Sequence, residues 1–356
     1  MMGMNIDPEK VKFGVEGPNA PWETIRDIAV YSEKIGLDSY WMPDHTVATG
    51  VKRWDAIEAW GALSALAVLT ERIMLASGVS DTYRYHPAVL AQKATTCDII
   101  SGGRAILGIG IGEAMNLVPF GIEYDKPVGR TIEAVKVINL LLTQDSVDFE
   151  GKYYRLNQAF LHPKPVQEPH YPIFLAGSSP RTMRMVGRYG DGWLPANLSV
   201  ERYREGRETV MNAAKEAGRD AEKLDMAHFM YGVIASSRDE ARERVMLPAK
   251  MLLLTRPRIL EAMGFEPPTY DFEMTWNLVF PRDGKRWLET AKQLPDEVVE
   301  KSPIVYGTVD DFIDRFEQYY KVGCRHFVMN FQVSPKILKG CLDLYTKVVG
   351  YFRESY

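Results

Sequence analysis

The residues best suited to chemistry in this chain of 356 residues are an acid and an imidazole side by side, Asp44 and His45. They directly follow a short apolar run, residues 39–42, and a strand needs neither group to complete its hydrogen bonds. An imidazole titrates near neutral pH, which suits proton transfer. Taken alone, Asp44 could instead be the N-cap of a helix, and His45 could be structural.

Other polar and small residues also stand where apolar runs end. They are Glu16, Ser77, Gly78, Glu113, Gly177, Ser178 and Ser179. Glu16 and Glu113 are candidate site residues, although each could equally form a salt bridge. The remaining histidines have no metal-ligand spacing, so we expect no metal site.

These residues need elements to position them, and short β-rich apolar runs alternate with stretches of helical period along most of the chain. The strand candidates are residues 11–17, 39–44, 73–80, 105–112, 172–177, 192–197, 226–235 and 326–331. Near-continuous apolar strands separated by helices indicate parallel strands buried on both faces. Eight such units predict a (β/α)8 barrel, an α/β fold, as a single domain over residues 1–356. A doubly wound open sheet is the competing fold.

Two segments interrupt the alternation. Residues 146–170 contain a hairpin-like turn at Glu150-Gly151 and then a Pro-rich run, and residues 255–303 are expected to be partly helical. Long insertions between barrel elements usually cover a pocket or mediate assembly.

The glycine-rich stretch GIGIGE, residues 108–113, is a weak match to a dinucleotide-binding turn. That fingerprint requires glycines in a turn that opens a helix, whereas these alternate inside an expected strand. Glycine there lets another backbone or a flat ring approach closely. The run 77–87, SGVSDTYRYHP, predicts a bulge followed by a helix that begins at Pro87.

Composition narrows the function classes. The formal net charge is −4 and no long Lys/Arg run occurs, which argues against a nucleic-acid partner. No apolar stretch is long enough for a membrane span. Three scattered cysteines without a pairing pattern indicate a reducing compartment, so we expect a cytoplasmic protein.

Seven motifs, taken in order, resemble the luciferase-like (β/α)8 flavoproteins, and within them the branch that uses the deazaflavin coenzyme F420. The motifs are FGVEGPNAPWETI, DSYWMPDH, SGVSDTYRYHPAVLAQKATT, SGGRAILGIGIGEAMN, FGIEYDKPVGRTIEA, FEGKYYRL and AGSSPRTMRMVGRYGDGW. The chain is similar to methylene-tetrahydromethanopterin reductases, F420-dependent sugar-phosphate and secondary-alcohol dehydrogenases, and phthiodiolone ketoreductases. The resemblance implies an oxidoreductase with a small-molecule substrate, and relatives suggest a homodimer.

The resemblance also implies residue roles. Asp44 and His45 match a pair beside the deazaflavin ring, with His45 in proton transfer and Asp44 at the ring edge or orienting His45. Ser77-Gly78 matches a non-proline cis peptide that backs the ring, and Asn116 matches a cofactor contact. Glu113 matches an acid near the reacting carbon, in partly apolar surroundings. Glu16 aligns with an acid of the pterin reductases. The loop formed by Gly177, Ser178 and Ser179 matches the phosphate side of the cofactor.

Three interpretations stay open. The leading one is F420-dependent hydride transfer, between C5 of the deazaflavin and a C=O, C–OH or pterin-type carbon. The second is an FMN-dependent monooxygenase, for which Arg181 and Arg184 could help to hold a phosphate. The third is a flavin-binding barrel without activity. The basic residue that the sugar-phosphate enzymes carry after the sixth strand is replaced here by Asn197-Leu198-Ser199, which disfavours a phosphorylated sugar.

Overall fold

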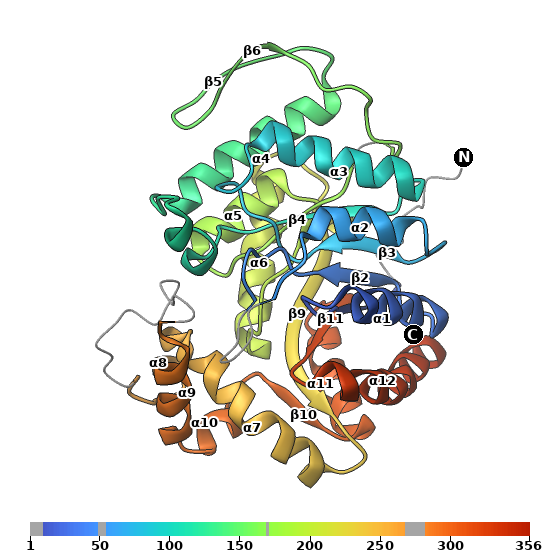
Figure 1. The fold of residues 1–356 in the computed structure, drawn as a ribbon, viewed down its shortest axis with the longest axis vertical. Coiled ribbons are helices and arrows are strands. Elements are labelled where there is room, and N and C mark those ends of the chain that lie inside the picture. Colours follow the sequence, from blue (N-terminus) through green and yellow to red (C-terminus); the bar gives the residue numbers. More distant parts are fainter. Residues whose placement is uncertain (1–9, 49–54, 169–170, 268–281) are drawn as a thin grey trace.

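Eight parallel strands close into a barrel that is surrounded by helices in the computed structural model of the chain (Figure 1). The structure describes residues 10–48, 55–168, 171–267 and 282–356. Around the barrel the strands follow the order β11, β1, β2, β3, β4, β7, β8 and β9, and β9 pairs with β11 to close it. Their bounds are β1 Lys12–Glu16, β2 Ser39–Met42, β3 Met74–Ser77, β4 Ala105–Ile109, β7 Ile173–Leu175, β8 Gly192–Trp193, β9 Asp225–Ile234 and β11 His326–Phe331. The predicted (β/α)8 barrel is therefore confirmed, and the open sheet is wrong.

The helices begin where local signals place them. Pro87 starts α3 as expected, and α1 runs between Pro21 and Gly36, whose positive φ of 82° ends it. Ser179 and Thr182 form a capping box at the start of α5. The helices around the barrel are α1 Trp22–Lys34, α2 Ala59–Ala67, α3 Pro87–Ser101, α4 Pro127–Thr143, α5 Pro180–Tyr189, α6 Val200–Glu216, α7 Arg238–Leu254, α11 Val309–Lys321 and α12 Pro335–Ser355. Short 3₁₀ turns are η1 Ala114–Asn116, η2 Val118–Phe120 and η3 Ala221–Lys223.

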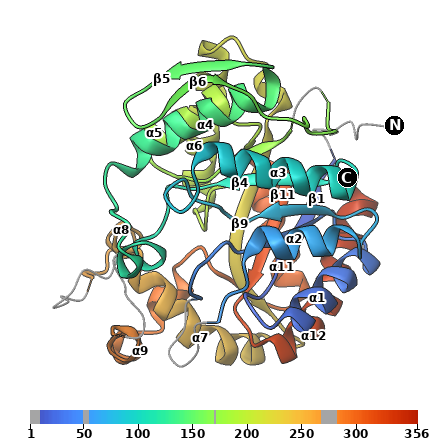
Figure 2. The ribbon, with the colours of Figure 1, turned by 45° about the horizontal axis from the view of Figure 1, so that its top comes forward.

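Both insertions have the expected character. The first forms an antiparallel hairpin of β5 (Val147–Glu150) and β6 (Arg155–Ala159), which lies over α4 in Figures 1 and 2. In its described residues the second insertion contains the helices α8 (Pro257–Ala262), α9 (Gly284–Gln293) and α10 (Glu297–Glu300). Its residues 268–281 lie outside the described residues.

One strand was not predicted from the sequence. The three residues of β10 (Val305–Gly307) pair with Gly232–Ile234 at the carboxyl end of β9, where Gly232 is the last residue that also pairs with β11. A three-residue strand is too short to show the period-two alternation that reveals longer strands.

The inside of the barrel is built in layers, because alternate residues of each strand point inward. The middle layer is apolar and consists of Trp41, Ala76, Ile106, Phe174, Leu194, Ala227, Phe229 and Val328. Toward the amino ends of the strands lie the polar residues Lys12, Ser39, Asp225 and His326. Toward the carboxyl ends lie Glu16, Tyr231 and Asn330.

The charged side chains at the amino end of the barrel neutralise one another. Lys12 Nζ lies 2.7 Å from Asp225 Oδ2, and His326 bridges the same carboxylate to Ser39, with Nε2 at 2.8 Å from Ser39 Oγ. Burial alone would raise the pKa of Asp225, but Lys12 and His326 hold it well below its usual range. This network is therefore a structural feature of the amino end, opposite the rim that carries the predicted site residues.

Candidate functional site

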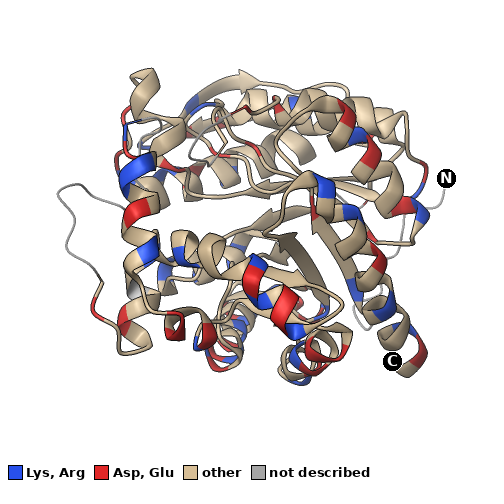
Figure 3. Ribbon diagram, turned by 60° about the horizontal axis from the view of Figure 1, so that its bottom comes forward, with Lys and Arg blue, Asp and Glu red and all other residues tan. Residues whose placement is uncertain are grey.

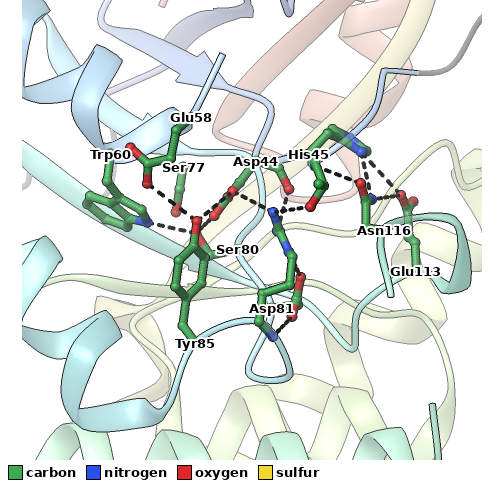
Figure 4. A network of polar contacts seen from close by, with 12 residues as sticks. Asp44, His45, Glu58, Trp60, Ser77, Ser80, Asp81, Tyr85, Glu113 and Asn116 are labelled. Carbon is green, nitrogen blue, oxygen red and sulfur yellow. Dashed lines mark hydrogen bonds and ion pairs between the residues drawn. The ribbon is translucent and has the colours of Figure 1, made fainter. Parts of the chain in front are cut away.

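His45 and Glu113 lie together at the carboxyl rim, and Asn116 joins them (Figure 4). The Asn116 amide nitrogen lies 3.0 Å from His45 Nδ1 and 3.4 Å from Glu113 Oε2, and His45 Nδ1 lies 3.5 Å from that carboxylate oxygen. His45 follows β2, whereas Glu113 and Asn116 belong to the segment after β4. The barrel thus brings together three of the residues predicted for the site.

Asn116 also determines which ring nitrogen of His45 is free. Its side-chain oxygen accepts hydrogen bonds from the backbone N–H groups of Thr46, at 2.8 Å, and Val47, at 3.2 Å. The amide nitrogen must then face His45, so Nδ1 of a neutral imidazole accepts and Nε2 carries the proton. Nε2 is the atom of His45 that can exchange a proton with a bound molecule.

Asp44 is buried, and other side chains occupy its carboxylate. Oδ2 accepts from Ser80 at 2.5 Å, and Oδ1 lies 3.1 Å from Arg84 and 3.3 Å from the Tyr85 hydroxyl. Burial raises the pKa of Asp44, while Arg84 and Ser80 oppose that increase. Arg84 also donates to the Asp44 carbonyl, at 2.6 Å. Asp44 therefore fixes the chain that carries His45, and no side-chain hydrogen bond joins the two among the described contacts.

The alternative in which Asp44 caps a helix is wrong, because the next described helix, α2, begins at Ala59 with Glu58 as its N-cap. The contacts of Ser80, Arg84 and Tyr85 with Asp44 were not predicted from the sequence. All three lie within the run 77–87 that predicted a bulge. The many polar residues of this run were the feature of the sequence that could have indicated these contacts.

The bulge after β3 is present, with one correction. The non-proline cis peptide joins Gly78 to Val79, one residue later than the predicted Ser77-Gly78 position. Ser77 is fully buried, and its hydroxyl donates to the Gly108 carbonyl at 3.0 Å and accepts from the Gly108 N–H at 3.1 Å. The Ser77 side chain thus links β3 to β4 and is not available to a ligand.

The glycines of the GIGIG stretch lie in close contact with the bulge after β3. A Cβ on Gly108 would lie 2.0 Å from the Ser77 carbonyl oxygen, and one on Gly110 would lie 2.6 Å from the Val79 side chain. The prediction of a close approach is confirmed, and the approaching group is the bulge itself. Larger residues at these two positions would displace the Gly78–Val79 peptide.

The loop of Gly177, Ser178 and Ser179 stands at the start of α5, at the same end of the barrel. Ser179 Oγ accepts from the Thr182 N–H at 3.2 Å, so this hydroxyl caps the helix. Gly177 has a φ of 141°, and a Cβ there would lie 2.5 Å from the Thr182 side chain. Ser178 is exposed and is the one hydroxyl of the loop open to a ligand.

Glu16, at the end of β1, is the acid whose surroundings are most unusual. Burial raises its pKa to about 8; a hydrogen bond from Asn330 opposes this, and the charge of Glu113 adds to it. Glu113, for which partly apolar surroundings were expected, has a side chain that is 39% exposed. The environment that favours a protonated carboxyl group at neutral pH is that of Glu16.

Two neighbours of Glu16 were missed in the sequence. Asn330 on β11 donates to Glu16 Oε2, and Asn330 lies opposite Tyr231 of β9 in the sheet register. The guanidinium of Arg256 lies 5.4 Å from the centre of the Tyr231 ring. Counting every second residue along each strand would have placed Asn330 and Tyr231 on the inner face, at the same rim as Glu16.

Other features lie away from this rim. A cavity of about 530 Å³ at the amino end is lined by Lys12, Asp225, Arg325 and residues around them. Within the described ranges, no three His, Cys, Asp or Glu side chains are placed to hold a metal ion, and no helix is long and apolar enough to cross a membrane. Figure 3 shows Lys and Arg interspersed with Asp and Glu on the helices of that view.

Comparison with known proteins places these features in context. A family described as luciferase-like monooxygenase matches residues 6–326. The phthiodiolone/phenolphthiodiolone dimycocerosates ketoreductase of Mycobacterium tuberculosis is 32% identical over 333 residues, 86% of this chain and 87% of its own. The F420-dependent glucose-6-phosphate dehydrogenase of Nakamurella multipartita is 28% identical over 335 residues, 91% and 92% of the two chains.

Among solved structures, the coenzyme F420-dependent tetrahydromethanopterin reductase of Methanopyrus kandleri superposes with a TM-score of 0.80. The match covers 96% of this chain and 99% of that one, at 24% sequence identity. At this identity the superposition shows a shared fold.

Proposed function

The chain belongs to the luciferase-like monooxygenase family, and from this premise we propose that it is an oxidoreductase that uses coenzyme F420. The observation that carries the proposal is the carboxyl rim itself, where Glu16 lies beside Gly78 of the bulge and His45 lies 3.5 Å from Glu113. The F420-dependent dehydrogenase among its relatives supports the choice of cofactor.

The residues at the rim fit a planar cofactor with an anionic tail. The bulge peptide packs on the Trp41 side chain, which would lie 3.3 Å from a Cβ on Gly78, with Glu16 beside it. The exposed Ser178 and the amino end of α5 favour an anionic group, because the hydroxyl can donate a hydrogen bond and the helix dipole attracts negative charge. When bound, the deazaflavin supplies a hydride from C5, and the protein supplies position and protons.

We assign proton handling to His45 and Glu16. His45 presents Nε2–H, and its Nδ1 is held by Asn116. Glu16, with a pKa of about 8, holds a proton at neutral pH and can release it to a substrate oxygen or nitrogen. Glu113 contacts the His45–Asn116 pair, with its Oε2 3.5 Å from His45 Nδ1 and 3.4 Å from the Asn116 amide nitrogen. The substrate classes that we propose are ketones, secondary alcohols and pterin-type C=N groups.

An anaerobic titration of the purified protein with F420, and separately with FMN, tests the proposal. Binding is followed by fluorescence quenching and absorbance. We expect tight binding of F420 and weak binding of FMN, followed by turnover with a ketone, alcohol or pterin substrate. Preference for FMN together with oxygen consumption would overturn the proposal. Cofactor binding without turnover of any substrate would favour a non-catalytic barrel.

An FMN-dependent monooxygenase is the second candidate function, because α5 carries two arginines near its amino end. Arg181 and Arg184 are exposed on the first turns of this helix, next to the Gly177–Ser179 loop. Two cations there could hold the phosphate of FMN. The Arg181→Ala/Arg184→Ala double variant should therefore lose affinity for FMN if this second candidate is correct.

We also propose that the chain acts as one barrel domain, forms a homodimer and works in the cytoplasm. The three cysteines, Cys97, Cys324 and Cys341, are buried and unpaired, as expected of a protein in a reducing compartment.

A further inference from the structure

We propose that Asn330 is the positioning residue for Glu16, holding Oε2 so that the other oxygen, Oε1, delivers the proton to the substrate. The inference rests on the proposed function, in which Glu16 is an acid. It specifies Oε1 as the atom from which the proton leaves and Asn330 as the residue that selects this atom.

The contacts of Asn330 define its orientation. Its amide nitrogen donates to Glu16 Oε2, and its amide oxygen accepts from the side chain of Gln332. A reversed amide would place its oxygen against the carboxylate and its NH₂ against the NH₂ of Gln332, which is unfavourable at both ends. Gln332 therefore keeps the donor group of Asn330 on Glu16.

The second oxygen of Glu16 lies beside the bulge. A Cβ on Gly78 would lie 3.3 Å from the Trp41 side chain and 3.7 Å from Glu16 Oε1, so Oε1 stands next to Trp41 at the bulge peptide. Among the described contacts, no protein group donates to or accepts from Oε1. A substrate lying against Gly78 would therefore meet Oε1, while Oε2 stays bound to Asn330.

This arrangement suits an acid that must lose its proton during the reaction. For the reduction of a ketone, bound reduced F420 would supply the hydride of the new C–H bond, and Glu16 would transfer the proton on Oε1 to the carbonyl oxygen to give an alcohol. Glu16 is left as a carboxylate, and the hydrogen bond from Asn330 stabilises that negative charge. Among the described contacts, the hydrogen bond to Oε2 comes from Asn330.

The first experiment measures the protonation of Glu16 directly in the cofactor-free protein. Glutamate labelled with ¹³C at the side-chain carboxyl is titrated from pH 5 to 10, and the Glu16 resonance is identified by its absence in Glu16→Gln. We expect a wild-type midpoint near 8, and an Asn330→Leu midpoint higher by about one to two pH units, because the charged form loses its donor.

Two further variants complete the set. Gln332→Leu should raise the midpoint by a smaller amount, because Asn330 stays in place but is less well oriented. Asn139→Leu is the matched control: that amide, on α4, donates to the Tyr189 carbonyl and should leave the midpoint unchanged. An Asn330→Leu midpoint equal to that of the wild type would overturn the inference. If Asn330→Leu does not fold, Asn330→Ser provides the same comparison.

The pH dependence of turnover in the F420-loaded enzyme distinguishes a failure of the role proposed for Asn330 and Glu16 from a failure of the proposed function. Activity that requires protonated Glu16 should fall as pH rises through the wild-type midpoint, and Asn330→Leu should shift this fall to higher pH. A shifted NMR midpoint with an unshifted activity profile would show that Glu16 is not the acid. That result would overturn the inference, because the proton would come from another residue, but would leave F420 dependence intact. Failure to bind F420 at all would contradict the proposed function and not the Asn330–Glu16 contact.

Discussion

Single residues at this rim are held by partners that their own sequence neighbourhoods do not reveal. Asn116 is bonded to the backbone at Thr46 and Val47 and thereby points its amide nitrogen at His45. Because the orientation of that amide is fixed, the imidazole has one defined free nitrogen, Nε2. The role proposed for His45 follows from this contact more than from its proximity to Asp44.

His45→Ala is expected to reduce turnover by about 10²- to 10⁴-fold, the usual contribution of a general acid–base group. Cofactor affinity should change much less, since the bulge and the α5 loop remain. Steady-state kinetics on the F420-loaded enzyme provide the measurement. His162→Ala, an exposed histidine in the first insertion, is the control and should retain wild-type turnover. Near-normal turnover of His45→Ala would refute the assignment.

Glu16→Gln is expected to stabilise the protein at high pH. The pKa of Glu16 is about 8 in the folded state against an ordinary 4.5, so between these values the folded protein keeps a proton that the unfolded chain has released. The free energy of unfolding of the wild type therefore falls as pH rises from 4.5 to 8, on the order of a few kcal/mol in total. Glutamine does not titrate, so the variant lacks this loss.

Urea unfolding at pH 5 and pH 8 measures the effect. The advantage of Glu16→Gln over wild type should be larger at pH 8 than at pH 5. Glu150→Gln, at an exposed hairpin position with a side chain 82% exposed, should behave like the wild type at both values. An equal difference at both pH values would show that Glu16 titrates normally.

Among the elements, the β5–β6 hairpin is fastened to the barrel by one acidic side chain of α4. Glu133 accepts hydrogen bonds from three backbone N–H groups at the turn, those of Lys152, Tyr153 and Tyr154, at 2.7 to 2.9 Å. The Tyr154 hydroxyl then donates to the Thr82 carbonyl at 2.9 Å, within the loop that surrounds Asp44. The first insertion thus supports the site from outside.

Glu133→Ala should increase hydrogen exchange at the amides of residues 152–154 by about 10- to 100-fold, because they lose a charged acceptor. Exchange measured by mass spectrometry or NMR would detect the change. Asp148→Ala is the matched control, since Asp148 accepts from the Gln158 N–H at the other end of the hairpin. Unchanged exchange at residues 152–154 would show that Tyr154 alone holds the turn.

At the scale of the whole molecule, buried titratable groups make the fold sensitive to acid. Burial lowers the pKa of His228 to about 3, and its Nε2 accepts from the Leu198 N–H at 3.0 Å. Below pH 6.5 the unfolded chain gains a proton on this histidine that the folded protein does not take up until about pH 3. Stability therefore falls as pH decreases through this window. Asp225, whose pKa is lowered, adds a loss at still lower pH.

His228→Gln should make the decrease in unfolding free energy between pH 6.5 and pH 4 shallower, by up to one proton equivalent. Glutamine keeps an acceptor for the Leu198 N–H and does not titrate. Urea unfolding across this range is the measurement, with His162→Gln as the exposed control. A slope identical to that of the wild type would mean that His228 becomes protonated in the folded state.

A homodimer is the prediction for assembly. Four apolar side chains are exposed at the adjoining ends of α2 and α3: Val68, Leu69, Ile99 and Ile100. Arg104 donates hydrogen bonds to the carbonyl groups of Ala67 and Ser101 and so links the ends of α2 and α3. A second copy of the chain that binds here would remove the four apolar side chains from water. Light scattering should give twice the chain mass of 40.4 kDa. Leu69→Asp should give the monomer mass, and a monomeric wild type would contradict the prediction.

The sequence by itself determined the barrel and the rim residues at the ends of its first strands. Strand and helix periods depend on residues close together in the chain, so they were readable before any tertiary contact was known. Asp44, His45 and Glu113 could be placed at one rim because parallel strands in a barrel end on the same side.

Only the tertiary structure decided which of these residues share a site and which are structural. Glu16 and Asn330 are 314 positions apart and meet because β1 pairs with β11 when the barrel closes. Ser77, predicted to contact a cofactor, has its hydroxyl bound to Gly108. The raised pKa of Glu16 likewise depends on how much protein surrounds it, a property of packing that the order of residues along one strand does not contain.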